Sequence, residues 1–568
     1  MKRYLLGCLM ILHAAAGTAQ VAHWQGGVSE NWSTAGNWSP AAVPGAGVNV
    51  LINTWSPNPT TLSGTATPDL GAIQIGETGQ GDLWVVSAAV LNNDEIGMLG
   101  SESGSTGFML VSDPGSAWYI DHNLVVGEQG AAQLQISNEG IVSNHHGRIG
   151  NSSGSHGVVN LSGQSTWTNS GNLFVGHTGT GALDIRQNSF VFNNSQAFVG
   201  YAGSGSGSIR VREGGDWVSW SDQRIGYYGE GELSIESGGK ALGTTGWIGV
   251  QSSGSGQVTV TGSGSEWNNT VDLQVGVWGS GELTIANGGR VENELGAVGG
   301  FASGHGKVSV TGENSKWISN QQLFVGNEGL GELTIQGGEV ITGGLAAIGS
   351  QIGSQGSVHL TSVNAYWHCQ SDLFVGWRGD GLLNIASNDA EVEVEGRVIV
   401  AVTEGSSGRV DVDGTLRVGS DTEVRAGGIL AGWGTVHGPV MIADNATLAP
   451  SPMVFDALSV GPLELAPATK LEIRFFEFMG AINSSQVVVN GDLVLDGVLE
   501  GIYSGGELDP GTYFLFSYSG ILTDNGLSIG SLPPLPPGHG ATIDTSIDGQ
   551  VLLVIAPAQD EIFSDRFE

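Results

Sequence analysis

The stretch from Gly249 to Gly299 reads GVQSSGSGQVTVTGSGSEWNNTVDLQVGVWGSGELTIANGGRVENELGAVG, and the sequence on both sides repeats it. Its clearest marker is a tryptophan that recurs every 49 or 50 residues: Trp118, Trp167, Trp217, Trp267, Trp317 and Trp367. The glycine of a Val-Gly or Ile-Gly pair keeps the same period: Gly127, Gly176, Gly226, Gly276, Gly326 and Gly376. A period as strict as this indicates a repeat architecture.

Each repeat divides into two similar halves. A second apolar-Gly pair lies between the first set, with its glycine at Gly150, Gly200, Gly249, Gly299 and Gly349. Both halves contain alternating apolar residues, such as Val258-Thr259-Val260 and Leu283-Thr284-Ile285, which is the period-two pattern of a half-buried strand. Gly, Ser and Asn separate the strands because they accept turn conformations at little cost. The pattern therefore predicts one coil per roughly 25 residues.

The predicted fold is all-β: a right-handed parallel β-helix (β-solenoid) of about 25-residue coils in 50-residue double-coil repeats, with N- and C-terminal β caps. Stacked coils bury Val, Leu, Ile and Phe in columns, and each coil needs its neighbours to do so. The alternative is a kelch-type propeller, whose blades share the period and carry paired glycines such as Gly238-Gly239 and Gly288-Gly289. The half-period favours the solenoid, because a four-stranded antiparallel blade has no reason to repeat within itself.

Changes of pattern along the chain predict six segments. These are a signal peptide (1–19), a Trp- and Pro-rich N-terminal cap (20–70), the β-solenoid repeats (71–420), a degenerate solenoid with a C-terminal β cap (421–530), a Pro-rich linker with a final hairpin (531–555) and an acidic C-terminal tail (556–568). For residues 20–70, a separate carbohydrate-binding element is the alternative to a cap.

The first segment predicts export. Lys2 and Arg3 precede an apolar run, and Gly17-Thr18-Ala19 supplies the small residues of a cleavage site, as in secretory signal peptides. No later apolar run reaches the length of a transmembrane helix, so we expect no transmembrane anchor in the mature chain. The expected location is the medium or the outer cell surface.

Composition agrees with export and limits the partners. Glycine accounts for 95 of 568 residues, and the formal net charge is −36. Such a surface repels nucleic acid and anionic membranes, so nucleic acid is not an expected partner. Cys369 is the one cysteine that remains after signal cleavage, which leaves no intramolecular disulfide, and we expect an inert small residue there.

The stretch after Arg425 resembles a known family. It reads AGGILAGWGTV from Ala426 to Val436 and leads to an Ala-Pro pair that ends at Pro450. This is similar to the end of the passenger region in autotransporter-type (type V secretion) adhesins, where Gly-Gly-x-Leu-x-Gly-x-Gly-Thr-Val precedes an Ala-Pro-Gly segment. The repeats also resemble passenger-associated β-strand repeats, and the start at Asn31-Trp32-Ser33 resembles proteins of that group.

The resemblance implies an adhesin at the outer membrane surface of a Gram-negative bacterium. One feature departs from the family: autotransporters end in a membrane β-barrel, and the sequence after Gly491 is too short for one. The expectation is a passenger-like protein that lacks the C-terminal translocator barrel, and a separate export partner is one way to replace it. The last residues, Glu561 to Glu568, resemble short Phe-Glu tails of secreted Gram-negative proteins, and an ordinary frayed end is the alternative.

The alternative function is a polysaccharide lyase or glycoside hydrolase on the β-helix scaffold. The Asn-Thr-Asp, Asp-Asp and Arg-Ile-Lys motifs of galacturonase-type enzymes are absent, and lysines are few. Glu232, Glu282 and Glu332 form one column two coils apart, which suits a solvated face better than a paired acid and base. Histidines lack the spacing of metal ligands. The sequence therefore predicts a non-catalytic protein without a cofactor or metal, acting as an adhesin-like binding or structural element.

Two columns of side chains are candidates for binding or stabilisation. The recurrent tryptophans Trp118, Trp167, Trp217, Trp267, Trp317 and Trp367 lie two coils, or ~10 Å, apart and are the candidate glycan-stacking residues, with glycans or a host or neighbour-cell surface as partner. The alternative is that the indoles pack between coils, and counting by twos from Leu273 places Trp267 inward. A polar column is expected to satisfy backbone groups at a corner: Asn123, Asn172, Gln223, Asp272, Gln322 and Asp372.

Overall fold

The computed structural model describes residues 20–451 and 457–558, so the predicted signal peptide and the last ten residues of the predicted tail lie outside the described residues. The described chain is a parallel β-solenoid, and the fold prediction is confirmed. It divides into two compact units: unit 1 comprises Met1–Leu183 with Ser189–Asn193, and unit 2 comprises Asp184–Asn188 with Asn194–Glu568.

A coil consists of one long strand followed by two short ones. In unit 2, β27 (Ser255–Thr261), β28 (Glu266–Asn269) and β29 (Asp272–Val275) form one coil, and β30 (Ser280–Ala286) begins the next. β27 pairs in parallel with β30, which places Val258 beside Leu283, and β28 places Trp267 beside Val291. The long strands form one sheet and the short strands another, here called the long-strand sheet and the short-strand sheet. The alternating apolar residues point inward in both.

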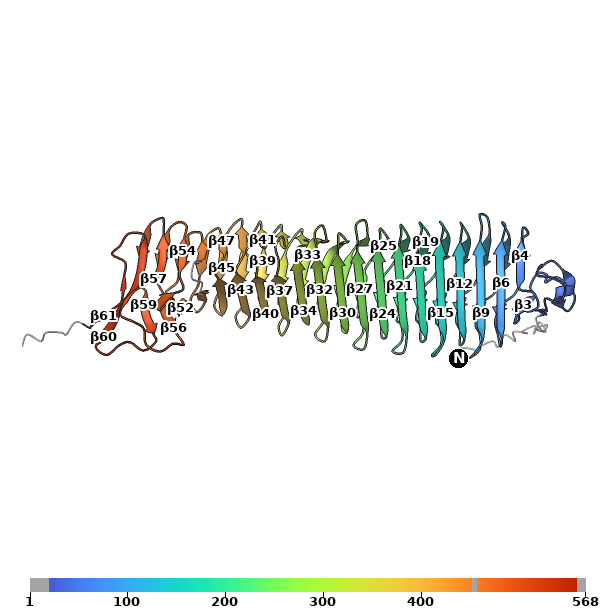
Figure 1. Cartoon of the computed structure of the whole chain (residues 1–568), viewed down its shortest axis with the longest axis horizontal. Helices are drawn as coiled ribbons and strands as arrows, with labels where there is room; N and C mark the ends of the chain where they lie inside the picture. Colours follow the sequence, from blue (N-terminus) through green and yellow to red (C-terminus); the bar gives the residue numbers. More distant parts are fainter. Residues whose placement is uncertain (1–19, 452–456, 559–568) are drawn as a thin grey trace, which may run out of the picture. The chain divides into compact units, whose positions relative to one another are not determined.

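In unit 1 the long strands stand side by side in chain order (Figure 1). They are β4 (Thr60–Ser63), β6 (Gln80–Val86), β9 (Thr106–Ser112), β12 (Ala131–Ser137) and β15 (His156–Ser162), and β18 (Thr180–Ile185) has residues in both units. The short strands are β3 (Asn49–Ile52), β5 (Ile73–Ile75), β7 (Val90–Asn93), β8 (Gly97–Leu99), β10 (Ala117–Ile120), β11 (Leu124–Val126), β13 (Ile141–Asn144), β14 (Gly147–Ile149), β16 (Thr166–Asn169), β17 (Leu173–Val175) and β19 (Phe190–Asn193).

Unit 2 continues the same pattern. Its long strands are β21 (Ser206–Arg212), β24 (Glu230–Glu236), β27, β30, β32 (His305–Thr311), β34 (Leu330–Gln336), β37 (Gln355–Leu360), β40 (Asp380–Ile385), β43 (Ser407–Val412), β46 (Gly428–Gly432), β49 (Thr447–Pro450), β52 (Lys470–Phe478), β56 (Val498–Ile502) and β59 (Ser528–Ser531). β53 (Ala481–Ser484) forms a hairpin with β52.

The short-strand sheet of unit 2 contains two strands per coil, which merge where the corner between them is extended. The strands are β20 (Ala197–Val199), β22 (Asp216–Ser219), β23 (Gln223–Ile225), β25 (Lys240–Gly243), β26 (Gly246–Ile248), β28, β29, β31 (Arg290–Val298), β33 (Lys316–Val325), β35 (Glu339–Thr342), β36 (Ala346–Ile348), β38 (Tyr366–Cys369), β39 (Leu373–Val375), β41 (Glu391–Val394), β42 (Val398–Val400), β44 (Thr415–Val418), β45 (Thr422–Val424), β47 (Thr435–His437), β48 (Val440–Ile442), β50 (Leu458–Val460), β51 (Leu463–Leu465), β54 (Val487–Val489), β55 (Leu493–Leu495), β57 (Gly511–Tyr518) and β58 (Leu522–Asp524).

Antiparallel strands replace the parallel ladder at the beginning of unit 1. β1 (Val21–Trp24) pairs in parallel with β3 but antiparallel with β2 (Trp38–Ser39), and the short 3₁₀ helix η1 (Ala35–Asn37) precedes β2. Trp24, Trp32 and Trp38 pack edge to face and are buried. These three indoles are therefore part of the core of unit 1 and are not accessible to a ligand.

Antiparallel strands also end the described part of unit 2. β57 pairs antiparallel with β61 (Gln550–Pro557), which pairs antiparallel with β60 (His539–Asp544). The preceding proline-rich stretch contacts the rest of the unit, since the N–H of Leu508 donates to the carbonyl of Pro534. Antiparallel pairing satisfies backbone groups that a bare terminal coil would expose.

Candidate ligand-binding surface

The recurrent tryptophans lie inside the solenoid. Trp118 and Trp167 in unit 1 and Trp217, Trp267, Trp317 and Trp367 in unit 2 each expose 0% of their surface. The prediction that these six residues stack on a glycan is therefore wrong, because no indole face reaches the surface. The alternative from the sequence, packing between coils, describes their position.

The buried indole N–H groups find acceptors in other coils. Five of the six Nε1 atoms donate to one side-chain oxygen each: Trp118 to Asn93 (2.8 Å), Trp167 to Asn144 (2.6 Å), Trp267 to Gln223 (2.7 Å), Trp317 to Asn293 (2.8 Å) and Trp367 to Thr342 (3.2 Å). A buried polar group without a partner is costly, so these acceptors are required wherever a tryptophan is buried.

The predicted polar column is wrong at one residue, Gln223. The pairing places it beside Ala197 and Gly246, which is the inward position that leucine occupies in other coils, and it is fully buried. Asp222 therefore holds the outward position assigned to Gln223 from the sequence. The reason is local: Gly243 stands where other coils have the asparagine acceptor, and Gln223 reaches across it to Trp267.

Small residues make room for the indoles. A Cβ atom added to Gly97, Gly147, Gly246 or Gly296 would come within 2.7–3.0 Å of the Cζ2 atom of the tryptophan in the following coil. Coils that carry the tryptophan therefore alternate with coils that carry a small residue at the glycine position beside the indole. This alternation explains why the repeat spans two coils.

Cys369 lies in the buried column of the short-strand sheet, beside Thr342. Burial raises the pKa of its thiol well above the ordinary value, which keeps it protonated near neutral pH. Cys369 is therefore a small core residue in an unreactive environment.

The apolar-Gly pairs lie at the corner where the chain leaves the short-strand sheet. Gly226 and Gly276 have φ angles of 70° and 68°, and a Cβ at either would lie 2.1 Å from a backbone oxygen, that of Ser255 in β27 or of His305 in β32. Only glycine fits such a turn without strain. The residues just after the glycine form the turn. The residue two positions before the glycine points outward from its strand.

Aromatic side chains gather at this corner in unit 2. The group, named here the aromatic corner, consists of Phe198, Tyr201, Arg224, Tyr227, Tyr228, Trp247, Trp278 and Phe301. Phe198, Arg224 and Trp247 occupy one outward column of β20, β23 and β26, and the other members lie on the turns that follow these strands or later ones. Phe198 is covered on this outer side at 6% exposure, whereas Tyr228 and Trp278 are exposed, and exposed aromatic side chains next to one another are informative because such residues are normally buried.

The tyrosine half of the aromatic corner is rigid. The rings of Tyr201 and Tyr227 stack with centroids 5.4 Å apart, and Tyr228 meets Tyr227 edge to face at 4.9 Å. The Arg224 guanidinium lies 5.5 Å from the ring centre of Phe198 and 5.6 Å from that of Tyr227, and it forms a 2.8 Å ion pair with Asp222. Tyr228 is 44% exposed, so this half presents an aromatic ring beside a fixed cation.

The second half is a pair of stacked rings, here called the platform. Trp278 and Phe301 stack in parallel, with ring centroids 4.2 Å apart and planes 3° from parallel. The backbone holds them in adjacent coils, since the N–H of Phe301 donates to the carbonyl of Val277. Trp278 is 38% exposed, so the platform faces solvent. The stacked faces cover each other, so the apolar surface open to a ring-shaped ligand is the part of Trp278 that solvent reaches.

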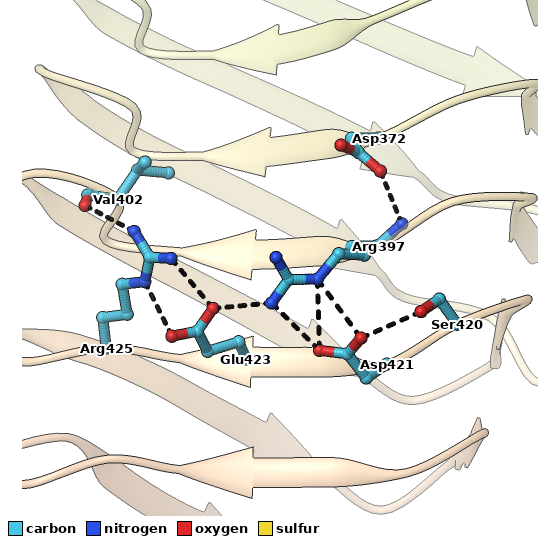
Figure 2. A network of polar contacts seen from close by, with 7 residues as sticks. All are labelled: Asp372, Arg397, Val402, Ser420, Asp421, Glu423 and Arg425. Atoms are coloured by element: carbon cyan, nitrogen blue, oxygen red, sulfur yellow. Dashed lines mark hydrogen bonds and ion pairs between the residues drawn. The ribbon is translucent and has the colours of Figure 1, made fainter.

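Towards the C-terminal end of the same sheet the outward residues change from aromatic to charged. Figure 2 shows a network around Arg397, whose guanidinium donates to Asp421 and, at 2.9 Å, to Glu423; Arg425 donates to Glu423 and to the carbonyl of Val402. Hydrogen bonds from Arg425 first, and then from Arg397, lower the pKa of Glu423. Burial alone would raise the pKa of Asp421, but its hydrogen bonds from Arg397 and Ser420 outweigh burial and lower it.

We expect Arg397→Gln to lower the free energy of unfolding by about 1 kcal/mol near pH 7, because the guanidinium is partly exposed and its pairs are screened. The lowered pKa values mean that this contribution is complete above the ordinary carboxyl pKa of about 4 and is lost as the pH falls through the folded-state values. Denaturation of both proteins between pH 7 and pH 3 measures this. Arg417→Gln, which removes a single exposed pair with Glu391, is the control with a smaller expected effect.

Other groups singled out in the sequence do not form a reactive centre. Glu232, Glu282 and Glu332 point outward from the long-strand sheet, and Gln257 and Lys307 separate them in the ladder. Within residues 20–451 and 457–558, no three His, Cys, Asp or Glu side chains lie where they could hold a metal ion. No helix in this part of the chain has the length and apolar character needed to cross a membrane.

The aromatic corner was not predicted, although the sequence contains a signal for it. Because Ala197, Val199 and similar residues face inward, Phe198 must face outward, and the same parity applies to Arg224 and Trp247. The recurrent tryptophans drew attention because of their period. The functional candidates include aromatic residues without that period, such as Trp278 and Phe301.

Comparisons with known proteins identify two partial relatives by sequence. A relative is the adhesin BmaC autotransporter of Brucella suis biovar 1 (strain 1330), which is 39% identical over 119 residues, or 20% of this chain and 3% of that protein. The resemblance to autotransporter-type adhesins is confirmed. An uncharacterized lipoprotein, YdeK of Escherichia coli (strain K12), is 27% identical over 176 residues, or 29% of this chain and 13% of that protein.

The chain thus spans only a small part of the curated relatives it matches. No protein-family model matches the sequence. Among solved structures, the crystal structure of a TibA fragment hyper-glycosylated by TibC is 14% identical, with a TM-score of 0.30, and the match covers 69% of this chain and 99% of that chain.

Proposed function

We propose that this chain is a non-catalytic, adhesin-like binding protein that is secreted or displayed at the outer cell surface, and that its aromatic corner contacts glycans. The partial relationship to an autotransporter adhesin supports the general role. The observation that carries the site is the pair of parallel, stacked rings of Trp278, which is exposed, and Phe301, which is half-buried. In this proposal the signal peptide at 1–19 directs export, the segments 20–70 and 421–530 cap the repeats, and export with the help of a separate partner stays a prediction.

Sugar rings suit the geometry of this surface. The faces of a pyranose carry C–H groups, which pack on the electron-rich face of an indole or phenyl ring. Tyr228 and Arg224, two coils before Trp278, add a phenolic group and a fixed cation that can hydrogen-bond hydroxyl or carboxylate groups of a longer glycan. A glycan along the sheet would meet rings that are already held by the backbone, so little side-chain entropy is lost on binding.

We expect Trp278→Ala to weaken glycan binding by about tenfold or more, because one half of the stacked platform is lost. Because the ring is partly exposed, unfolding stability should change by less than about 1 kcal/mol. The measurement is binding to an immobilised glycan panel, followed by titration of the best ligand. Trp220→Ala, which removes a tryptophan that is 69% exposed outside the aromatic corner, is the control with unchanged binding.

Two outcomes would contradict the proposal. Equal binding by Trp278→Ala and the unaltered chain would remove the aromatic corner as the site. Release of reducing ends or unsaturated uronates from a polysaccharide, abolished by a single Asp or Glu substitution, would establish a carbohydrate-active enzyme instead.

A further inference from the structure

A separate cavity lies on the outer face of the long-strand sheet in unit 1. Its volume is about 340 Å³, at the lower end of the range for small-molecule sites, which is about 300–1,000 Å³. Asp82, Phe108, Gln133 and Val158 line it from four consecutive strands, β6, β9, β12 and β15, in one outward column. The hollow exists because Ala131, in the next column, is shorter than its neighbours Thr106 and His156.

The polar groups in this cavity lack partners in the protein. Among the described residues, the Asp82 carboxylate and the Gln133 amide have no hydrogen bond, and Asp82 has no ion pair, although the chain contains many arginine–carboxylate pairs elsewhere. Asp82 is half-buried, and burial raises its pKa. A partly desolvated carboxylate without a cation is unfavourable, so the site favours a ligand that brings positive charge.

One aromatic ring lines the cavity beside this carboxylate, and two others lie near it outside the lining. Phe108 lies directly beside Asp82 in the ladder, about 4.8 Å away along the hydrogen-bonding direction. Trp84 follows two residues later on the same outward face and is 39% exposed. Trp55, 52% exposed, is held nearby because its Nε1 donates to Oε1 of Gln80 at 2.7 Å, and Gln80 precedes Asp82 on that face.

We propose that the cavity around Asp82 and Phe108 binds a substituted ammonium cation of the choline type. Such a cation carries its charge on methyl groups, so it can lie against an aromatic face and a carboxylate without requiring strong hydrogen-bond acceptors for N–H groups. Phe108 is the aromatic residue in the lining, and the Gln133 amide can bond a hydroxyl or phosphate on the remainder of the ligand. These observations are confined to unit 1, so the proposal does not rest on the aromatic corner.

Titration of the full chain with choline at constant ionic strength tests this proposal. Saturation-transfer NMR on the choline methyl signal gives the binding, and sodium chloride is the matched salt. Asp82→Asn and Phe108→Ala are each expected to weaken binding about tenfold, since each removes one of the two attractions on the cation. Asp121→Asn and Tyr119→Ala, which alter an exposed carboxylate and an exposed ring elsewhere in unit 1, should leave binding unchanged.

Several results would overturn the proposal. The first is that the chain binds choline no more strongly than the neutral isostere 3,3-dimethyl-1-butanol. The second is that Asp82→Asn leaves the affinity for choline unchanged, and the third is that the cavity binds neutral sugars more strongly than choline. If Phe108→Ala does not fold, Phe108→Leu retains the volume but removes the ring, and it should still weaken binding. Trp278→Ala should bind choline normally, so failure at this site and failure at the aromatic corner are distinguishable.

Discussion

Replacing Trp267 with alanine is expected to lower the free energy of unfolding by about 3–5 kcal/mol. The indole is fully buried between coils of unit 2, so its removal leaves a cavity that neighbouring backbone strands cannot collapse to fill. The same change leaves the amide oxygen of Gln223 without the indole N–H that it accepts at 2.7 Å. The lost packing and the unsatisfied buried oxygen act in the same direction.

Denaturant unfolding followed by circular dichroism measures this loss, together with hydrogen exchange, because a solenoid can open in sections. Exchange should rise most in the coils around β28. Trp220→Ala, at an exposed position, is the matched control and should change stability by no more than about 0.5 kcal/mol. A loss below about 1 kcal/mol in Trp267→Ala would contradict the packing role.

The repeat made the architecture predictable from the sequence. Once Val258 and Leu283 are known to occupy equivalent positions one coil apart, parallel pairing fixes the register, and a slip of one residue would turn every apolar side chain outward. The same parity places Trp267 inside. Period and alternation therefore determine the coil length, the parallel pairing and the side to which each strand residue points.

The corrections concern contacts between coils that depart from the repeat. Gln223 was placed one position away from its true column because it replaces a leucine, and its role depends on Gly243 in the next coil. The repeat pattern gives no signal for this replacement of one acceptor by another, because it occurs at one place in the sequence. The cavity beside Asp82 is equally local: it requires a short side chain at Ala131 and an aromatic one at Phe108, on the long strands of two adjacent coils.

The origin of the double-coil repeat can be tested at Gly246. Gly246→Val is expected to lower the free energy of unfolding by about 3 kcal/mol, because its Cβ alone would lie 2.7 Å from Cζ2 of Trp267. Trp267→Leu, which leaves part of the indole volume empty, should cost a similar amount. The chain itself already pairs a larger residue at the glycine position with a smaller one at the tryptophan position. Val398 occupies the position equivalent to Gly246, and Leu416, two coils after Trp367, occupies the tryptophan position.

The double variant Gly246→Val/Trp267→Leu should therefore be more stable than the sum of the single losses predicts. We expect a coupling energy of at least about 1 kcal/mol, which a double-mutant cycle by denaturant unfolding measures. Gly238→Ala with Trp267→Leu is the control pair, because no atom lies within 4 Å of a Cβ added at Gly238. Its two losses should add, since the strain at Gly238 comes from its φ angle of 80° and not from the indole. Strict additivity at Gly246 as well would mean that the alternation of small and large residues does not set the fifty-residue period.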